Sequence, residues 1–269
     1  MIYSFSSIDT YKQCPRKFYY SYIEKLPRKP SIHFERGKIM HNVIERFFES
    51  ADSNMDLDDM KFLGRNLLIA CWNKKKEELE TLGVGNLDFY LEESKLMVDR
   101  WVEYFFNEMQ SEVDAGYIRA DAFERLRPQM EVNYKSDELE LSGRIDSINE
   151  KDGEVEVVDF KTSKDADVGK YRLQIGIYAL LYKMEHGKLP DKGALFFFKH
   201  GKKRVVVDEE LVEDVKKELE EVKEKTKSVV REDYPKCVTS LCKWSTGQCD
   251  YFEKCFKNDR EYAEEKRKG

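Results

Sequence analysis

The dipeptide Asp152-Gly153, set between two runs rich in β-branched residues, is the strongest constraint on how this 269-residue chain folds. Asp-Gly in such a setting is typical of a two-residue β-hairpin loop. With these residues as the loop, Lys151 pairs with Glu154, and the same register places Asp146 opposite Asp159. The sequence therefore predicts two strands that bring two acidic residues face to face.

The same register gathers further charge on one face of the hairpin. Arg144 lies opposite Lys161, and Lys161 shares a face with Asp159 because side chains alternate with a period of two. Two facing carboxylates repel each other and need a compensating cation. Oxygen ligands without a nearby cysteine suit Mg²⁺ or Mn²⁺ better than zinc. The alternative is an exposed polar strand pair with an incidental Asp-x-Lys.

Length and charge narrow the class of protein. A chain of this length holds one large domain or two small ones. It has no window of 18 apolar residues and its start lacks the apolar segment of a signal peptide, so we expect a soluble, cytoplasmic protein with no membrane partner. The net charge of -6 and the pI near 5.5 argue against a broad electrostatic grip on duplex DNA.

Local basic tracks nevertheless lie in a chain rich in aromatic rings. Basic groups beside rings suit single-stranded nucleic acid, because bases stack on the rings while phosphates meet the cations. Each ring taken singly is better explained as a core residue. The basic tracks are Arg16-Lys17, Arg28-Lys29, Arg36-Lys38 and Lys199 to Arg204, and the rings are Phe18, Tyr19, Tyr20 and Tyr22.

Hydrophobic periodicity predicts a helical block, three antiparallel strands, a crossover helix and two further strands, followed by a charged helix capped by Asp208. This order implies an α/β fold with a mixed sheet. The predicted helices are 35–50, 58–80, 88–113 and 168–186, the last ended by Gly187. The predicted strands are 129–135, 138–149, 154–161, 193–199 and 203–207.

Two polar pairs lie on predicted helices at a spacing of four residues. His41 precedes Glu45 on the first helix, and Gln174 precedes Tyr178 on the helix at 168–186. A lone histidine on a helix is usually structural. From the residues alone, the favoured interpretation of Gln174 and Tyr178 is an ordinary helix flank.

The six cysteines are unevenly distributed. Cys71 lies among apolar residues at helical spacing and is interpreted as a small core residue. In an intracellular chain, clustered cysteines more often bind a metal or a cluster than form disulfides. The remaining cysteines are Cys14 near the start and Cys237, Cys242, Cys249 and Cys255 near the end.

In their order and spacing these motifs resemble the RecB-like branch of the PD-(D/E)XK nuclease superfamily, which includes CRISPR adaptation nucleases and exonuclease V relatives with an iron-sulfur cluster. The resemblance spans nearly the whole chain. It begins with Ser-x-Ser followed by Gln-Cys-Pro-Arg-Lys-Phe between Ser4 and Phe18. The further motifs are Gly37-x-x-x-His41, Gly143-Arg144-Ile145-Asp146, Asp159-Phe160-Lys161, Gln174-x-x-x-Tyr178 and the C-terminal cysteines.

The resemblance implies a restriction-endonuclease-like core, with a mixed central β-sheet flanked by helices, an N-terminal helical block and an iron-sulfur element that joins the two ends of the chain. We expect one nuclease domain over 1–269. Its expected parts are a helical block at 35–125, an α/β catalytic core at 129–207 and a cysteine region made of 1–30 with 233–260.

The resemblance also implies a ligand set for Mg²⁺ or Mn²⁺. Asp146 and Asp159 would bind the ion, with His41 and the Phe160 carbonyl as further ligands. Glu131 is similar to an acidic residue that relatives carry on the preceding strand.

Three further residues resemble the catalytic positions of the family. Lys161 is similar to the catalytic lysine, and Gln174 and Tyr178 are similar to the motif that orients the active site and the DNA. Because carboxylates adjoin Lys161, we expect its amine to stay protonated. It would then stabilise the charge of the transition state and orient water rather than act as a free base.

For the cysteines, the resemblance implies a 4Fe-4S cluster held by Cys14, Cys242, Cys249 and Cys255. The five residues between Cys249 and Cys255 fit the family pattern. The six residues between Cys242 and Cys249 exceed the usual Cys-x-x-Cys, and Cys237 offers a rival ligand. Zinc is the alternative metal.

The expected activity is that of a metal-dependent DNA nuclease, an exonuclease on single-stranded DNA or DNA ends in recombination, repair, CRISPR adaptation or phage replication. The chain has no Gly-x-x-x-x-Gly-Lys-Ser/Thr loop, so a helicase or a recombination or adaptation protein would be a separate partner. The alternatives are a catalytically idle DNA-binding or scaffold subunit and a zinc-binding structural protein.

Overall fold

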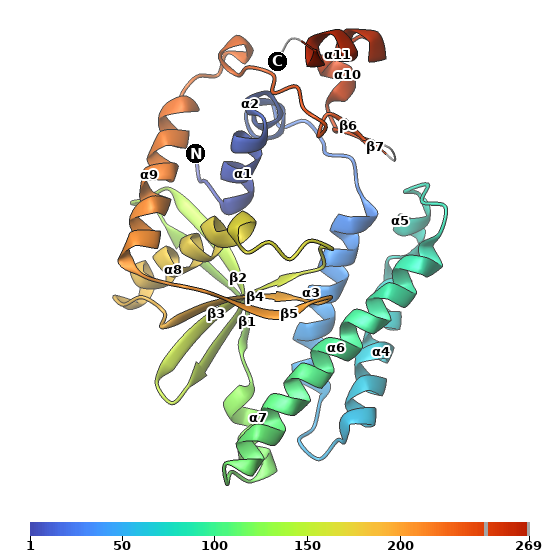
Figure 1. The fold of residues 1–269 in the computed structure, drawn as a ribbon, viewed down its shortest axis with the longest axis vertical. Coiled ribbons are helices and arrows are strands. Elements are labelled where there is room, and N and C mark those ends of the chain that lie inside the picture. The colour runs from blue at the N-terminus through green and yellow to red at the C-terminus, as the bar shows by residue number, and fades with distance from the viewer. Residues whose placement is uncertain (245–246, 268–269) are drawn as a thin grey trace. The chain divides into compact units, whose positions relative to one another are not determined.

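The computed structural model describes residues 1–244 and 247–267, which form two compact units. The sheet unit comprises Pro30–Val215. The terminal unit joins Met1–Lys29 to Lys216–Gly269. Figure 1 shows that the terminal unit contains both ends of the chain.

A five-stranded sheet of order β1-β2-β3-β4-β5 forms the centre of the sheet unit (Figure 1). Neighbouring strands are antiparallel except β3 and β4, which are parallel and are joined through a crossover helix. The predicted α/β fold with a mixed sheet flanked by helices is therefore confirmed. The strands are β1 (Gln129–Ser136), β2 (Leu141–Lys151), β3 (Glu154–Lys161), β4 (Lys192–Phe197) and β5 (Gly201–Val205).

The hairpin between β2 and β3 turns at the predicted residues. Asp152 and Gly153 have φ of 55° and 80°, as a loop with two left-handed residues requires. Lys151 pairs with Glu154, which confirms the predicted register at the loop.

The ladder between β2 and β3 ends earlier than the sequence predicts. Its last pair is Ser147 with Val158. One step further, the Asp146 carboxylate accepts the backbone N–H of Phe160 at 2.8 Å, in place of a strand-to-strand bond. The prediction that Asp146 and Asp159 form a ladder pair is therefore wrong, because the Asp146 side chain accepts the Phe160 N–H in place of a backbone carbonyl.

The predicted helices of the sheet unit are present, with shifted ends. The one expected at 58–80 is interrupted at Lys75, and the one expected at 168–186 begins as a short 3₁₀ turn. The eight-residue helix α7 was not predicted. The helices are α3 (Ile32–Ser50), α4 (Leu57–Lys74), α5 (Lys76–Glu80), α6 (Leu87–Asp114), α7 (Arg119–Leu126), the 3₁₀ turn η2 (Gly169–Tyr171) and α8 (Arg172–His186).

Both faces of the sheet are covered by apolar side chains. On one face, Val158 and Phe160 pack into a core shared with α3, α4, α6 and α7. On the other, Val157 and Phe197 pack against α8. The alternation of β3 side chains between these two cores follows from the period of two in a strand.

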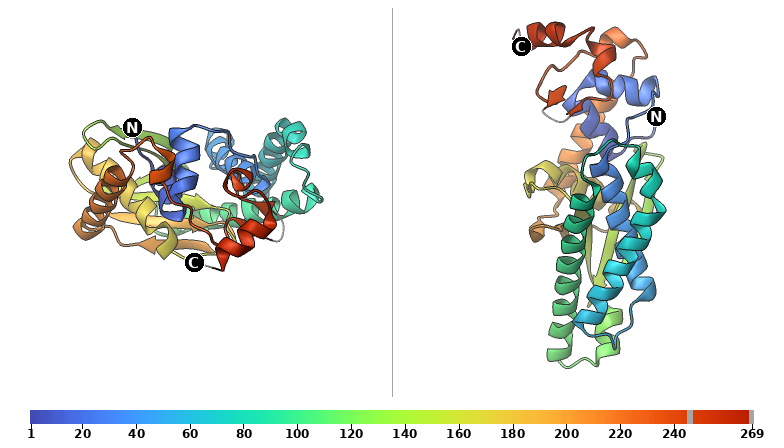
Figure 2. Two further views of the ribbon diagram at one scale, coloured as in Figure 1. Left: turned by 90° about the horizontal axis from the view of Figure 1, so that it is seen from above. Right: turned by 90° about the vertical axis from the view of Figure 1, so that its right-hand side faces the viewer.

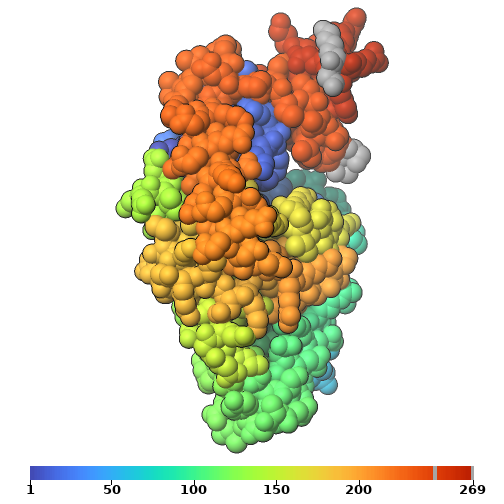
Figure 3. Space-filling view, turned by 60° about the vertical axis from the view of Figure 1, so that its left-hand side comes forward, coloured from blue at the N-terminus to red at the C-terminus, as the bar shows by residue number. Residues whose placement is uncertain are grey.

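Helix α9 (Glu209–Lys225) begins as predicted, because the Asp208 carboxylate accepts the Leu211 N–H at 2.8 Å. Its first turns lie against α8 at Gly176, where an added Cβ would meet Val215 at 2.5 Å. Figure 3 shows this side of the molecule, with α8 in gold and α9 in orange. Gly187 ends α8 with φ of 74°, as the sequence predicts.

The terminal unit ties the two ends of the chain together. The Tyr3 and Thr226 hydroxyls lie 2.7 Å apart, and Arg16 Nε donates to the Tyr234 carbonyl at 2.7 Å. Its elements are α1 (Phe5–Gln13), α2 (Pro15–Phe18), the π-helix η1 (Tyr19–Ile23), the 3₁₀ turn η3 (Arg231–Asp233), β6 (Lys243–Trp244), β7 (Gly247–Gln248), α10 (Phe252–Cys255) and α11 (Asp259–Lys266). Within residues 1–244 and 247–267, no helix has the length and apolar character needed to cross a membrane.

Two helical glycines give a matched test of packing. In α4, which runs beside α6 (Figure 2), a Cβ on Gly64 would lie 2.7 Å from Val98 Cγ1, whereas one on Gly37 in α3 would meet nothing within 4 Å. We expect Gly64→Ala to lower the free energy of unfolding by about 1–3 kcal/mol, because stiff β-branched neighbours must move. Gly37→Ala should raise it by up to about 1 kcal/mol through helix propensity. Urea denaturation measures both, and equal shifts would contradict the packing described for α4 and α6.

Candidate functional site

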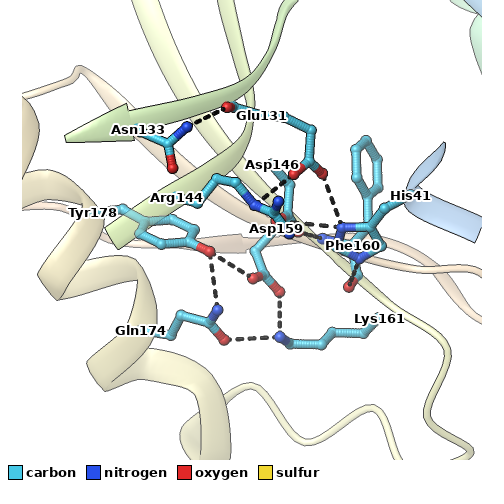
Figure 4. A network of polar contacts seen from close by, with 10 residues as sticks. All are labelled: His41, Glu131, Asn133, Arg144, Asp146, Asp159, Phe160, Lys161, Gln174 and Tyr178. Carbon is cyan, nitrogen blue, oxygen red and sulfur yellow. Dashed lines mark hydrogen bonds and ion pairs between the residues drawn. The ribbon is translucent and has the colours of Figure 1, made fainter. Parts of the chain in front are cut away.

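Polar side chains from two helices and three strands converge beside the ends of β2 and β3 (Figure 4). Every site residue that the sequence predicts in the sheet unit lies in this network. The residues are His41 on α3, Glu131 on β1, Arg144 and Asp146 on β2, Asp159, Phe160 and Lys161 on β3, and Gln174 and Tyr178 on α8.

One histidine and two carboxylates form a compact group that could hold a metal ion. His41 Nδ1 lies 3.2 Å from Glu131 Oε1 and 3.4 Å from Asp146 Oδ1. One ligand atom from each residue lies within 4.8 Å of the other two, the only such group among the described residues. The other imidazole nitrogen of His41 lies 3.3 Å from the Phe160 carbonyl oxygen.

The backbone at Glu131 is strained, with φ of 54° in the middle of β1. A non-glycine residue in this left-handed region is uncommon and persists only where the surroundings hold it. Glu131 also forms an ion pair with Arg144, whose Nε lies 2.6 Å from Glu131 Oε2. The predicted facing of Arg144 and Lys161 lies beyond the end of the β2 and β3 ladder, and no pattern in the sequence indicated the pairing of Arg144 with Glu131.

The charges of this group depend on retained protons. Burial raises the pKa of Asp146 to about 7, with the neighbouring Asp159 charge adding to the effect. Burial alone would lower the pKa of His41, but its hydrogen bond to Glu131 and the charges of Asp146 and Asp159 raise it to about 9. The same contact with His41 lowers the pKa of Glu131 against the opposing effect of burial. Near neutral pH the imidazole is therefore a cation among carboxylates.

A ring of hydrogen bonds links the second acid to helix α8 (Figure 4). Lys161 Nζ lies 2.6 Å from Asp159 Oδ2 and donates to Gln174 Oε1 at 2.7 Å. Gln174 donates to the Tyr178 hydroxyl at 3.0 Å, and Tyr178 donates to Asp159 Oδ1 at 3.1 Å. Burial and the nearby carboxylates raise the pKa of Tyr178 well above its usual value, so its hydroxyl stays a neutral donor.

A family model described as the PD-(D/E)XK nuclease superfamily matches residues 2–256. The chain belongs to this superfamily. Membership supports a nuclease hydrolase that uses a divalent metal ion, and the acidic group described above is a candidate metal site. No curated protein matches the chain. A solved structure named "Putative exonuclease", from Eubacterium rectale, is similar at a TM-score of 0.49 and 12% identity, over 89% of this chain and 85% of that chain.

The acidic residues of the site are grouped differently from the grouping that the sequence predicted. The expected ligand pair was Asp146 with Asp159, and Glu131 was the less certain candidate. In the structure Glu131 and Asp146 lie beside His41, whereas Asp159 is held by Lys161 and Tyr178. The spacing of Glu131, Asp146 and Asp159 in the sequence does not indicate which of them lies beside His41.

The five cysteines of the terminal unit line a small pocket of about 40 Å³. Lys17 and Lys236 belong to the same lining. Burial raises the pKa of Cys255 to about 12, with the neighbouring Cys14 adding to the effect. The sixth cysteine, Cys71, is buried in the sheet unit and donates to Asn42 at 3.1 Å, consistent with its interpretation as a core residue.

Two tyrosines of α8 separate hydrogen bonding from packing. Tyr178 is 4% exposed and serves both Gln174 and Asp159, so Tyr178→Phe leaves buried groups unpaired and should lower the free energy of unfolding by about 1–3 kcal/mol. Tyr182 is 7% exposed, packs on His186, and has no hydroxyl partner within the described residues. Tyr182→Phe should therefore change stability by less than about 0.5 kcal/mol. Urea denaturation in chelator distinguishes them, and equal losses would contradict the ring of bonds.

Proposed function

We propose that this chain is a Mg²⁺- or Mn²⁺-dependent deoxyribonuclease that acts as an exonuclease on single-stranded DNA or on DNA ends. The observation that carries the proposal is the placement of the His41, Glu131 and Asp146 ligand atoms within 4.8 Å of one another, next to the Asp159 and Lys161 pair. A structural ion pair does not require a buried carboxylate such as Asp146, whose pKa burial and the Asp159 charge raise to about 7.

The donor set fits a hard divalent ion. Carboxylate and carbonyl oxygens with one imidazole suit Mg²⁺ or Mn²⁺. His41, Asp146, Asp159 and the Phe160 carbonyl would hold the ion, and the position of Glu131 supports it as a further ligand. Once bound, the ion lowers the pKa of its water and offsets charge on the phosphate oxygens. A divalent cation here would replace the proton that His41 now holds among the carboxylates.

Lys161 is the proposed catalytic residue. Its amine is fixed by Asp159 and Gln174, with the ring of Tyr171 at 4.6 Å. A fixed ammonium stabilises the charge that develops on the phosphate in the transition state and orients the attacking water. Gln174 and Tyr178 are proposed positioning residues, because each holds a partner of the Asp159 and Lys161 pair.

The proposal predicts that Lys161→Ala lowers cleavage by about 100-fold or more while DNA and metal binding change little. The measurement is digestion of labelled single- and double-stranded DNA with and without Mg²⁺ or Mn²⁺. Lys170→Ala, an exposed lysine on the turn before α8, is the matched control and should keep full activity. Full turnover by Lys161→Ala would refute the assignment.

The wild-type assay also tests the function itself. Substrates blocked at the 5′ or the 3′ end separate exonuclease from endonuclease action and give the polarity. DNA binding without cleavage in either metal would instead identify an idle binding or scaffold subunit. The proposed setting is recombination, repair, CRISPR adaptation or phage replication, with any helicase as a separate chain. We propose a cytoplasmic location because free clustered thiols suit a reducing compartment.

For the terminal unit we propose a structural 4Fe-4S cluster on Cys14, Cys242, Cys249 and Cys255. The cysteines line one pocket, and Lys17 and Lys236 supply positive charge beside an anionic thiolate cluster. Zinc is the alternative occupant of the same pocket.

Two serine variants test the ligand choice. Cys242→Ser should lower the iron content and the visible absorbance of anaerobically purified protein, whereas Cys237→Ser should leave both near wild type. The reverse result would make Cys237 the ligand. A colourless wild-type protein with stoichiometric zinc would overturn the cluster. Iron, zinc and acid-labile sulfide analysis measures all three outcomes.

A further inference from the structure

Exposed aromatic rings gather at the N-terminal ends of α3 and α6. Phe34 is 61% exposed and Phe89 is 51% exposed. The Phe89 ring contacts Tyr90 at 5.5 Å between centroids, and Tyr90 contacts the ring of His33, the neighbour of Phe34, at 5.6 Å. Lys38 Nζ lies 4.1 Å from the centroid of the Phe34 ring. The patch therefore combines open ring surface with a cation.

At this patch three cations, Arg36, Lys38 and Lys199, outnumber two carboxylates. These carboxylates are Glu93 and the buried Glu35, which pairs with Lys38 at 3.0 Å. Arg36 is 2% exposed, lies 5.4 Å below the Tyr90 ring and pairs with Glu93. Lys199 pairs with the same carboxylate, so two cations share one anion. Burial lowers the pKa of His33, and Arg36 and other nearby cations lower it further, as expected in a positive environment.

The patch leads along α3 to the proposed active site. Phe34, Lys38 and His41 follow one another at steps of four and three residues, which places them on one helix face about 10 Å long. Arg36 also contacts the Thr162 carbonyl at 3.5 Å, next in the chain to Lys161. The rings and the proposed catalytic lysine are therefore joined through a short, continuous part of the sheet unit.

We propose that Phe34 and Phe89 form a platform on which unpaired bases stack as single-stranded nucleic acid enters the site, with Lys38 facing its phosphates. This inference rests on the proposed function and defines the form of its substrate. Bases can stack on protein rings only when they are unpaired, so the platform selects single strands over duplex. A polyanion also matches the cation excess below the rings, which an apolar protein partner would leave uncompensated.

The test is fluorescence anisotropy of the full chain, in chelator, with a labelled single-stranded oligonucleotide and with a hairpin duplex of equal length. The Phe34→Ala, Phe89→Ala double variant should weaken single-strand binding by about tenfold or more and change duplex binding by less than about twofold. Phe62→Ala is the matched control, because Phe62 on α4 is 68% exposed and lies outside the patch. It should bind both nucleic acids like wild type.

Three results would overturn the platform: unchanged single-strand affinity of the double variant, equal loss for single strand and duplex, or equal loss in Phe62→Ala. Hydrolysis of bis(p-nitrophenyl) phosphate with Mn²⁺ separates this inference from the proposed function, because that ester has no bases to stack. The double variant should hydrolyse it at the wild-type rate. A wild-type protein that cleaves neither this ester nor DNA would refute the nuclease, while the binding comparison would still decide the platform.

Discussion

The bond from the Phe160 N–H to the Asp146 carboxylate determines how the whole site is built. It takes the place of a backbone hydrogen bond between β2 and β3, so their pairing ends at Ser147 and Val158, next to Asp146 and Asp159. The Phe160 carbonyl then lies 3.3 Å from His41 instead of serving a strand. The Phe160 N–H therefore bonds to Asp146 of β2, and the Phe160 carbonyl faces His41 of α3. The hydrogen bond also offsets part of the free energy that burial of the Asp146 carboxylate costs.

Much of this arrangement could be predicted because it is local. The Asp152-Gly153 loop sets its own register through left-handed φ values, and the pairing near it follows. Gln174 and Tyr178 share a helix face because they are four residues apart, and the structure joins them at 3.0 Å. Asp208 caps its helix through a bond within three residues. Each of these depends on the backbone geometry of a short segment.

What could not be predicted depends on distant segments. No local pattern says that Glu131 adopts φ of 54° or that it, rather than Asp159, lies beside His41. The early end of the ladder at Ser147 required knowing that Asp146 would reach the Phe160 N–H. A propensity rule describes a residue by its neighbours in sequence, whereas these contacts join strands to a helix about 90 or more residues away.

Under the proposed function, the two unusual charge clusters of the sheet unit would bind different parts of one substrate complex. The buried carboxylates of the site lie beside the cations His41, Lys161 and Arg144, a setting that a divalent cation would stabilise further. Around Glu93, two cations share one carboxylate, a setting that an anion improves. A metal ion and a phosphate backbone supply these two charges together. Because both clusters flank α3, a strand lying along that helix would satisfy each of them in a single binding event.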